Sequence, residues 1–225
     1  MDGMILEAEP PEPEKHAIIT SGIFRRELVH APEPTTSCVL WVAGVSGDGE
    51  RYDEIVEVLN RAGFDVLRFG GWTSEKDLSP LSIHDVLIAI EDTERILRER
   101  GYAFIGYLGK SFGGLLGLLS RSGYDRMVLW APAVSLGSAS DTRTRISDLR
   151  RIFDFSVSEE SLAQKTWPIL LISGANDEVL PLQAARALVE ALANGEGLEV
   201  ETGHSVERAV ETLEATIDYL TRTER

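Results

Sequence analysis

The stretch that decides the fold is Gly106-Tyr107-Leu108-Gly109-Lys110-Ser111-Phe112-Gly113-Gly114. The apolar and aromatic run over 102–105 predicts a buried strand before it, and the apolar run over 115–119 predicts a buried helix after it. Between them lies the pattern Gly-x-Ser-x-Gly. A serine on so tight a turn needs small neighbours because the flanking backbone passes close to the helix, and Gly109 and Gly113 supply them.

Such a turn places the Ser111 hydroxyl above the end of the strand. The first N–H groups of the following helix then point toward an oxygen bound there, with help from the helix dipole. A phosphate-binding loop is the alternative, because Gly109-Lys110-Ser111 also ends a Walker A motif. That motif needs a glycine five positions before the Gly-Lys pair, and Phe104 stands there, so the phosphate loop is excluded.

Composition narrows the class of protein. The 225 residues carry a formal net charge of −15, which argues against nucleic acid as a partner because its phosphates attract clustered cations. No apolar stretch is long enough to span a membrane. The first residues lack the basic start and apolar region of a signal peptide, so a cytoplasmic location is the default expectation. The lone cysteine, Cys38, lies in an apolar run and is predicted to be a buried thiol.

Strand and helix patterns alternate along the chain, which predicts an α/β fold with a mostly parallel twisted sheet and helices on both faces. Residues 1–15, rich in proline and glutamate, are expected to form a tail before a single domain over 16–225. The expected strands cover 16–20 and 23–30 as a hairpin, then 38–42, 65–69, 102–105, 127–130, 169–172 and 198–200. The main expected helices are one that ends before Gly63, then 82–100, 182–192 and one ending near 221.

The segment 133–166 interrupts this alternation. Four apolar residues at three- and four-residue spacing predict a helix within it: Ile146, Leu149, Ile152 and Phe153. Since the segment follows a strand at its carboxyl end, where open parallel sheets bind ligands, it is a candidate lid. An ordinary connecting helix fits the same pattern equally well.

A serine hydroxyl needs a base, and histidine is the usual one. The chain has four histidines, of which His16, His30 and His84 fall in the hairpin or at a helix start, where packing or surface roles are expected. His204 lies in Glu201-Thr202-Gly203-His204-Ser205, between the last strand and the last helix. That loop is at the same edge of the sheet as Ser111, so His204 is the predicted base.

The imidazole in turn needs a carboxylate to fix its tautomer. Asp177 is the predicted one, because it follows the strand over 169–172 and emerges at the same edge. Two alternatives remain: Asp177 and Pro181 could merely begin the following helix, or the neighbouring Glu178 could take the role, although an alternating chain would point it elsewhere.

The order Ser111, Asp177, His204, within Gly109-Lys110-Ser111-Phe112-Gly113, Gly174-Ala175-Asn176-Asp177 and Gly203-His204-Ser205, resembles the α/β-hydrolase family over nearly the whole chain from residue 16. The resemblance implies Ser111 as nucleophile, His204 as general base and then acid, and Asp177 as the orienting carboxylate. It also implies an oxyanion hole made by the backbone N–H groups of Val45 and Phe112. Many members have His-Gly at the first of these loops, where this chain has Ala43-Gly44.

The resemblance is to compact members of the dienelactone-hydrolase and carboxylesterase sort. It implies a serine hydrolase that cleaves small or medium carboxylic esters or thioesters through an acyl-enzyme, with a small-molecule acyl partner and no metal or organic cofactor. Trp72, Phe112 and the segment 133–166 are candidates for the pocket lining, and core packing is the alternative for Trp72. An acyltransferase or peptidase with the same triad, and a non-catalytic scaffold that binds a small molecule or a protein, remain open; the oligomeric state is not predicted.

Overall fold

A computed structural model describes residues 16–21, 24–47, 52–72, 74–138, 141–146 and 155–222. The predicted tail over 1–15 lies outside these residues. So do Leu149, Ile152 and Phe153 of the predicted insertion helix.

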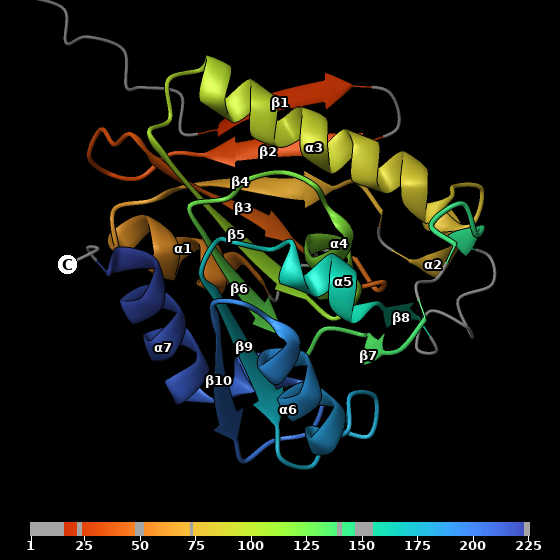
Figure 1. Ribbon diagram of the computed structural model, residues 1–225. Coiled ribbons are helices and arrows are strands. Elements are labelled where there is room, and N and C mark those ends of the chain that lie inside the picture. The colour runs from red at the N-terminus through yellow and green to blue at the C-terminus, as the bar shows by residue number, and fades with distance from the viewer. Residues whose placement is uncertain are drawn as a thin grey trace, which may run out of the picture.

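The described residues form a sheet of eight strands in the order β1-β2-β4-β3-β5-β6-β9-β10 (Figure 1). The strands from β4 to β10 run parallel, whereas β2 is antiparallel to both β1 and β4. The mostly parallel sheet and its N-terminal hairpin are therefore confirmed. The strands are β1 (His16–Ser21), β2 (Phe24–Val29), β3 (Ser37–Val42), β4 (Asp65–Gly70), β5 (Phe104–Lys110), β6 (Arg126–Trp130), β9 (Ile169–Gly174) and β10 (Gly195–Val200).

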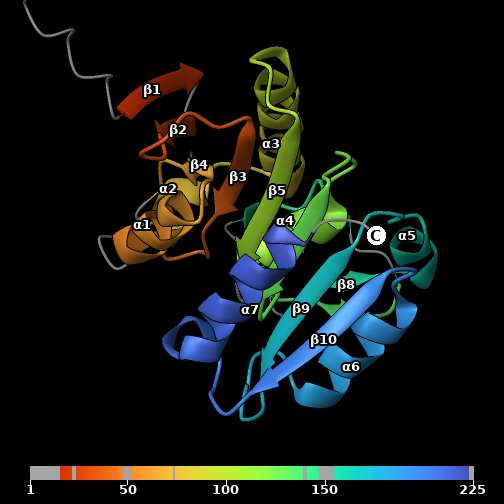
Figure 2. The same ribbon diagram turned by 90° about the vertical axis from the view of Figure 1, so that its left-hand side faces the viewer.

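Helices cover both faces of the sheet, as Figures 1 and 2 show. The apolar residues of α1 and α7 pack in one cluster with Trp41 and Trp130, and those of α3, α4 and α6 pack in a second cluster on the other face. Because both faces are covered, the inner strands read as almost unbroken apolar runs instead of alternating ones. The helices are α1 (Asp53–Arg61), α3 (Ile83–Glu99), α4 (Phe112–Leu119), α6 (Leu182–Ala191) and α7 (Val210–Thr221), with the short α2 (Glu75–Leu78), α5 (Glu159–Ala163) and η3 (Val206–Arg208).

The helix α3 shows how local sequence sets an element's limits. Its N-cap Ser82 accepts a hydrogen bond from the backbone N–H of Asp85, whose carboxylate accepts one from the backbone N–H of Ser82. Gly101, with a φ of +92°, follows the last turn. Ile88 is 50% exposed, although its neighbours Leu87 and Ala89 are buried. At 100° per residue it lies about 200° from the buried Val86 and Ile90, and so faces outward.

The segment 133–166 is tied to the start of α3 where it is described. The backbone N–H groups of His84 and Ile146 donate to the carbonyls of Thr142 and Leu81, at 2.7 and 2.8 Å. It also contains two short paired strands, β7 (Ser135–Leu136) and β8 (Ser156–Val157), followed by α5. Whether the segment acts as a lid stays a prediction.

Two further expectations concern single features. Cys38 is fully buried, as predicted, and this burial raises the pKa of its thiol. Of the helices that the structure describes, none combines the length and apolar character needed to cross a bilayer.

Candidate active site

The turn between β5 and α4 holds Ser111 in a conformation that L-residues rarely adopt, with a φ of +51°. Its backbone N–H donates to the carbonyl of Trp130 at 2.8 Å, and its carbonyl accepts from the N–H groups of Leu115 and Ala133, both at 3.0 Å. Strain of this kind persists where the surroundings fix the backbone, and it is common at functional sites. The turn therefore presents the Ser111 hydroxyl at the carboxyl end of the sheet.

The two glycines that flank Ser111 are needed for close backbone contacts. A Cβ on Gly113 would lie 2.0 Å from the carbonyl oxygen of Val42, and one on Gly109 would lie 2.6 Å from the carbonyl oxygen of Gly113. Contacts between a Cβ and another atom are essentially never shorter than 3.0 Å. The Gly-x-Ser-x-Gly pattern thus allows α4 to start directly against the end of β3.

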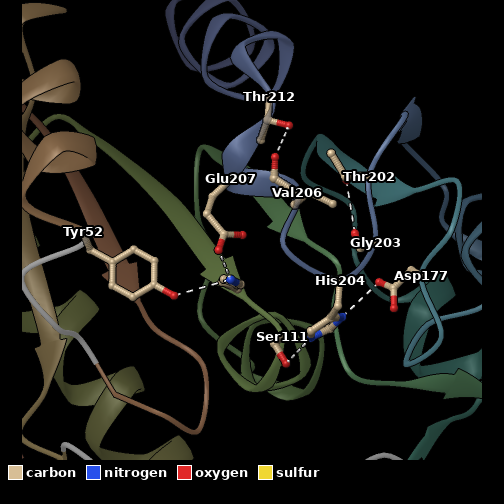
Figure 3. Close-up of polar contacts among 10 residues, drawn as sticks. Tyr52, Ser111, Asp177, Thr202, Gly203, His204, Val206, Glu207 and Thr212 are labelled. Carbon is tan, nitrogen blue, oxygen red and sulfur yellow. Dashed lines mark hydrogen bonds and ion pairs between the residues drawn. The ribbon is translucent and has the colours of Figure 1, made fainter.

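His204 and Asp177 lie beside Ser111, as Figure 3 shows. His204 Nε2 is 2.9 Å from Ser111 Oγ, and His204 Nδ1 is 2.9 Å from Asp177 Oδ2. The three side chains come from the segments that follow β5, β9 and β10, because parallel strands end at the same edge. The structure therefore brings together all three residues that the sequence singled out.

The loops that carry Asp177 and His204 are held against each other through their backbones. The N–H of Asn176 donates to the carbonyl of Thr202 at 2.9 Å. A Cβ on Gly174 would lie 2.2 Å from the carbonyl oxygen of Gly203, so this approach requires glycine at position 174.

The Asp177 carboxylate is fully buried and all its described contacts are donors. Oδ1 accepts from the backbone N–H groups of Val179 and Leu180 at 2.7 and 3.0 Å, and Oδ2 contacts His204. Burial alone would raise the pKa of Asp177, but the hydrogen bonds from His204 and these N–H groups outweigh it and lower that pKa below its usual value.

An ionised Asp177 can only accept hydrogen bonds, so it selects one histidine tautomer. His204 Nδ1 must donate to it, which leaves Nε2 to accept the proton of the Ser111 hydroxyl. The His204 side chain is 26% exposed and lies between the buried carboxylate and the hydroxyl. The arrangement can accept a proton from Ser111 and return it to a leaving group.

The alternatives for the carboxylate fit the structure less well. The following helix, α6, begins at Leu182 after Pro181, with no side-chain cap, so Asp177 does not cap it. Glu178 is exposed.

The other histidines lie elsewhere. His30 Nδ1 contacts the carboxylate of Asp65 at 2.9 Å, where β4 begins, at the opposite end of the sheet from Ser111. His84 is exposed in the first turn of α3, and His16 begins the edge strand β1.

The loop after β3, which carries Val45, lies against the Ser111 turn. A Cβ on Gly44 would be 3.5 Å from the Cβ of Ser111. The N–H of Phe112 belongs to the first residue of α4 and has no acceptor within that helix. Both predicted N–H donors therefore lie in segments that adjoin Ser111, and their role in an oxyanion hole stays a prediction.

Trp72 packs in the core. It is 4% exposed and its ring meets that of Phe112, itself fully buried, edge to face at 6.4 Å between centroids. Its indole N–H donates to the carbonyl of Gly44 at 2.9 Å. This hydrogen bond ties Trp72 to the loop that carries Val45, and the sequence analysis missed it. The only hint in the sequence was a tryptophan in a loop that follows a strand at the same edge of the sheet.

Sequence reasoning also missed Lys110, whose amine forms an ion pair with Glu207 beside Ser111.

A large groove of about 1390 Å³ lies at the other end of the sheet, lined by His30, Asp65 and Tyr102 among others, and does not include Ser111. In the part of the chain that the structure describes, no three His, Cys, Asp or Glu side chains are grouped so that they could hold a metal ion.

Comparison with known proteins identifies the fold. No family model and no curated protein matches the sequence. Several solved structures have a similar fold. The enol-lactonase from Burkholderia xenovorans LB400 has a TM-score of 0.71 and 17% identity, over 92% of this chain and 100% of that one. Est1E from Butyrivibrio proteoclasticus with bound ferulic acid has a TM-score of 0.70 and 18% identity, over 92% of this chain and 100% of that one. The monoacylglycerol lipase of Paleococcus ferrophilus has a TM-score of 0.69 and 17% identity, over 88% and 98%. At such identities the likeness is one of fold.

Proposed function

Because the chain has the α/β-hydrolase fold, we propose that it is a serine hydrolase that cleaves small or medium carboxylic esters or thioesters through an acyl-enzyme on Ser111. The observation that carries the proposal is the unbroken chain of contacts from Ser111 Oγ through His204 to the buried Asp177, with both distances at 2.9 Å. A binding scaffold has no need of a strained serine whose hydroxyl proton has an acceptor in place.

In the first half-reaction the Ser111 oxygen attacks the carbonyl carbon of the substrate while His204 Nε2 takes the hydroxyl proton. The carbonyl oxygen becomes negatively charged, and the N–H groups of Phe112 and Val45 are proposed to stabilise it. Asp177, ionised and held by two backbone N–H groups, stabilises the imidazolium that forms. Nε2 then gives its proton to the departing alcohol or thiol.

In the second half-reaction water replaces the leaving group. His204 takes a proton from the water, whose oxygen attacks the acyl carbon, and then returns a proton to Ser111 as the carboxylic acid departs. Every proton transfer passes through one nitrogen, so the reaction needs no metal or organic cofactor.

A fluorophosphonate probe tests the proposal, since it forms a covalent bond with an activated serine. We expect one adduct, located on Ser111 by mass spectrometry, absent in Ser111→Ala and formed at least about 100-fold more slowly in His204→Ala. A panel of esters and thioesters of increasing acyl length would then define the substrate class.

Unmodified Ser111, under conditions that label a control esterase, would contradict the proposal. The non-catalytic scaffold would then be the better account of the fold. An unchanged labelling rate in His204→Ala would also contradict the proposal, because Ser111 would then react without its base.

A further inference from the structure

A buried ion pair lies beside the Ser111 turn. The Lys110 amine contacts the Glu207 carboxylate, and the two side chains are only 7% and 5% exposed. The Tyr52 hydroxyl lies 3.4 Å from the same amine, and the Tyr52 ring centroid is 5.7 Å from it. Figure 3 shows Tyr52 and Glu207 of this cluster near Ser111 and His204.

The pair connects the same two segments as the Ser111–His204 hydrogen bond. Lys110 is the last residue of β5 and directly precedes Ser111, and Glu207 lies in η3, three residues after His204. One contact joins residues 110 and 207 and the other joins 111 and 204. The two contacts therefore run side by side between the nucleophile turn and the histidine loop.

Two other contacts of the histidine loop lead in different directions. Thr202 accepts from Asn176 in the Asp177 loop, and the carbonyl of Val206 accepts from the hydroxyl of Thr212 on α7 at 2.8 Å. These contacts fix the two ends of the loop relative to β9 and α7. They do not set its distance from β5, which is the distance that the Ser111–His204 bond requires.

Global stability is a poor explanation for such a pair. Removing two charges from water is costly, and apolar residues of similar size often replace a buried ion pair without loss of stability. A pair of opposite charges does, however, favour one separation and one partner, which an apolar contact does not. Because the pair lies between the two segments that carry the reacting atoms, this preferred separation can set the distance between those segments.

We propose that Lys110 and Glu207 are positioning residues that hold the histidine loop at the distance from β5 at which His204 Nε2 meets Ser111 Oγ. The proposal rests on the proposed function for its effect on rate, although the structural part does not. Tyr52 is the third member, and it restrains the Lys110 amine from the side of α1.

The decisive variant is the double substitution Lys110→Met with Glu207→Leu. It removes both charges together, so neither is left buried alone, and it keeps an apolar volume in the same place. The matched control is Arg186→Gln with Glu199→Gln, which removes an exposed pair between α6 and β10 with contacts of 2.6 and 2.8 Å. Lys110→Arg keeps the positive charge and tests for rescue.

Two measurements separate positioning from folding. Hydrogen exchange followed by mass spectrometry reports on the amides of Arg208 and Ala209, which donate to Ser205 and Val206 within η3. The rate of fluorophosphonate labelling, with kcat and KM on the best ester, reports on the reacting atoms. Thermal unfolding of each variant is measured alongside.

We expect the double apolar variant to unfold within a few degrees of the native protein. Its η3 amides should exchange at least about 10-fold faster, and kcat and labelling should fall about 100-fold, with KM changed less than about threefold. Lys110→Arg, which keeps the positive charge, should lose less kcat and labelling rate than the double apolar variant. The surface control should match the native protein in every readout.

Native exchange in η3 together with native labelling in the double apolar variant would overturn the proposal. If the native protein itself does not label Ser111, the proposed hydrolase function fails, yet faster η3 exchange in the variant would still support the positioning role. Faster exchange spread over the whole chain, with a lower unfolding temperature, would show a stabilising role instead and would also refute it.

Discussion

The contact between the Asp177 and His204 loops makes Gly174→Ala a sharp test of the site. The new Cβ would lie 2.2 Å from the carbonyl oxygen of Gly203 and 2.5 Å from that of Thr202. Because such contacts are essentially never under 3.0 Å, one backbone must move by about 0.8 Å, the difference between 3.0 and 2.2 Å. Both obstacles are main-chain atoms, so no side-chain rotation can relieve the clash.

The displaced residue directly precedes His204. A movement of that size along the bond would lengthen the distance between His204 Nε2 and Ser111 Oγ from 2.9 Å to about 3.7 Å, beyond a hydrogen bond. A misplacement of about 1 Å costs on the order of 100-fold in rate. Overpacking of this kind also costs roughly 1–3 kcal/mol of stability. We therefore expect Gly174→Ala to fold with a lower unfolding temperature and to label Ser111 about 100-fold more slowly.

The assay compares fluorophosphonate labelling rates and thermal unfolding of Gly174→Ala with those of Gly123→Ala. A Cβ on Gly123 would meet no atom within 4 Å, so the control makes the same chemical change in open space. Its labelling rate should equal that of the native protein. Labelling of Gly174→Ala within threefold of the native rate, at an unchanged unfolding temperature, would refute the reasoning from the close approach.

Three other predictions concern single residues. Asp177→Asn should slow acylation on the order of 1,000-fold or more, measured as the labelling rate, because its amide would donate to His204 Nδ1 and leave Nε2 protonated; a loss under 10-fold would contradict this. Trp72→Phe removes the hydrogen bond to the carbonyl of Gly44 and should lower kcat about 10-fold by loosening the adjoining N–H donor, with native kcat as the contrary result. Burial lowers the pKa of Lys165 to about 8 from 10.5, so between these pH values the unfolded chain binds more protons than the folded one. The free energy of unfolding, measured by urea titration relative to Lys165→Met, should therefore rise by about 3 kcal/mol over this pH range. A difference that stays flat or falls with pH would contradict this.

Local sequence determined the elements near the candidate active site and pointed to Ser111, Asp177 and His204, which the structure brings together. A residue pattern records what each segment buries. Parallel strands all end at one edge, so a serine, an aspartate and a histidine that follow such strands lie at the same edge of the sheet. Periodicity was less reliable for single residues. Ile88 is apolar and lies in an amphipathic helix, but its angle around the helix axis leaves it 50% exposed.

The tertiary structure decided what depends on residues far apart in the chain. The order of the strands places β3 between β4 and β5, and no local pattern contains that information. The core position of Trp72 behind the Val45 loop, and the pairing of Lys110 with Glu207 across 97 positions, exist because separate elements pack together. Sequence periodicity reports the burial of each segment by itself, whereas the distance between two side chains from different segments is set by the packing of the whole sheet and its helices.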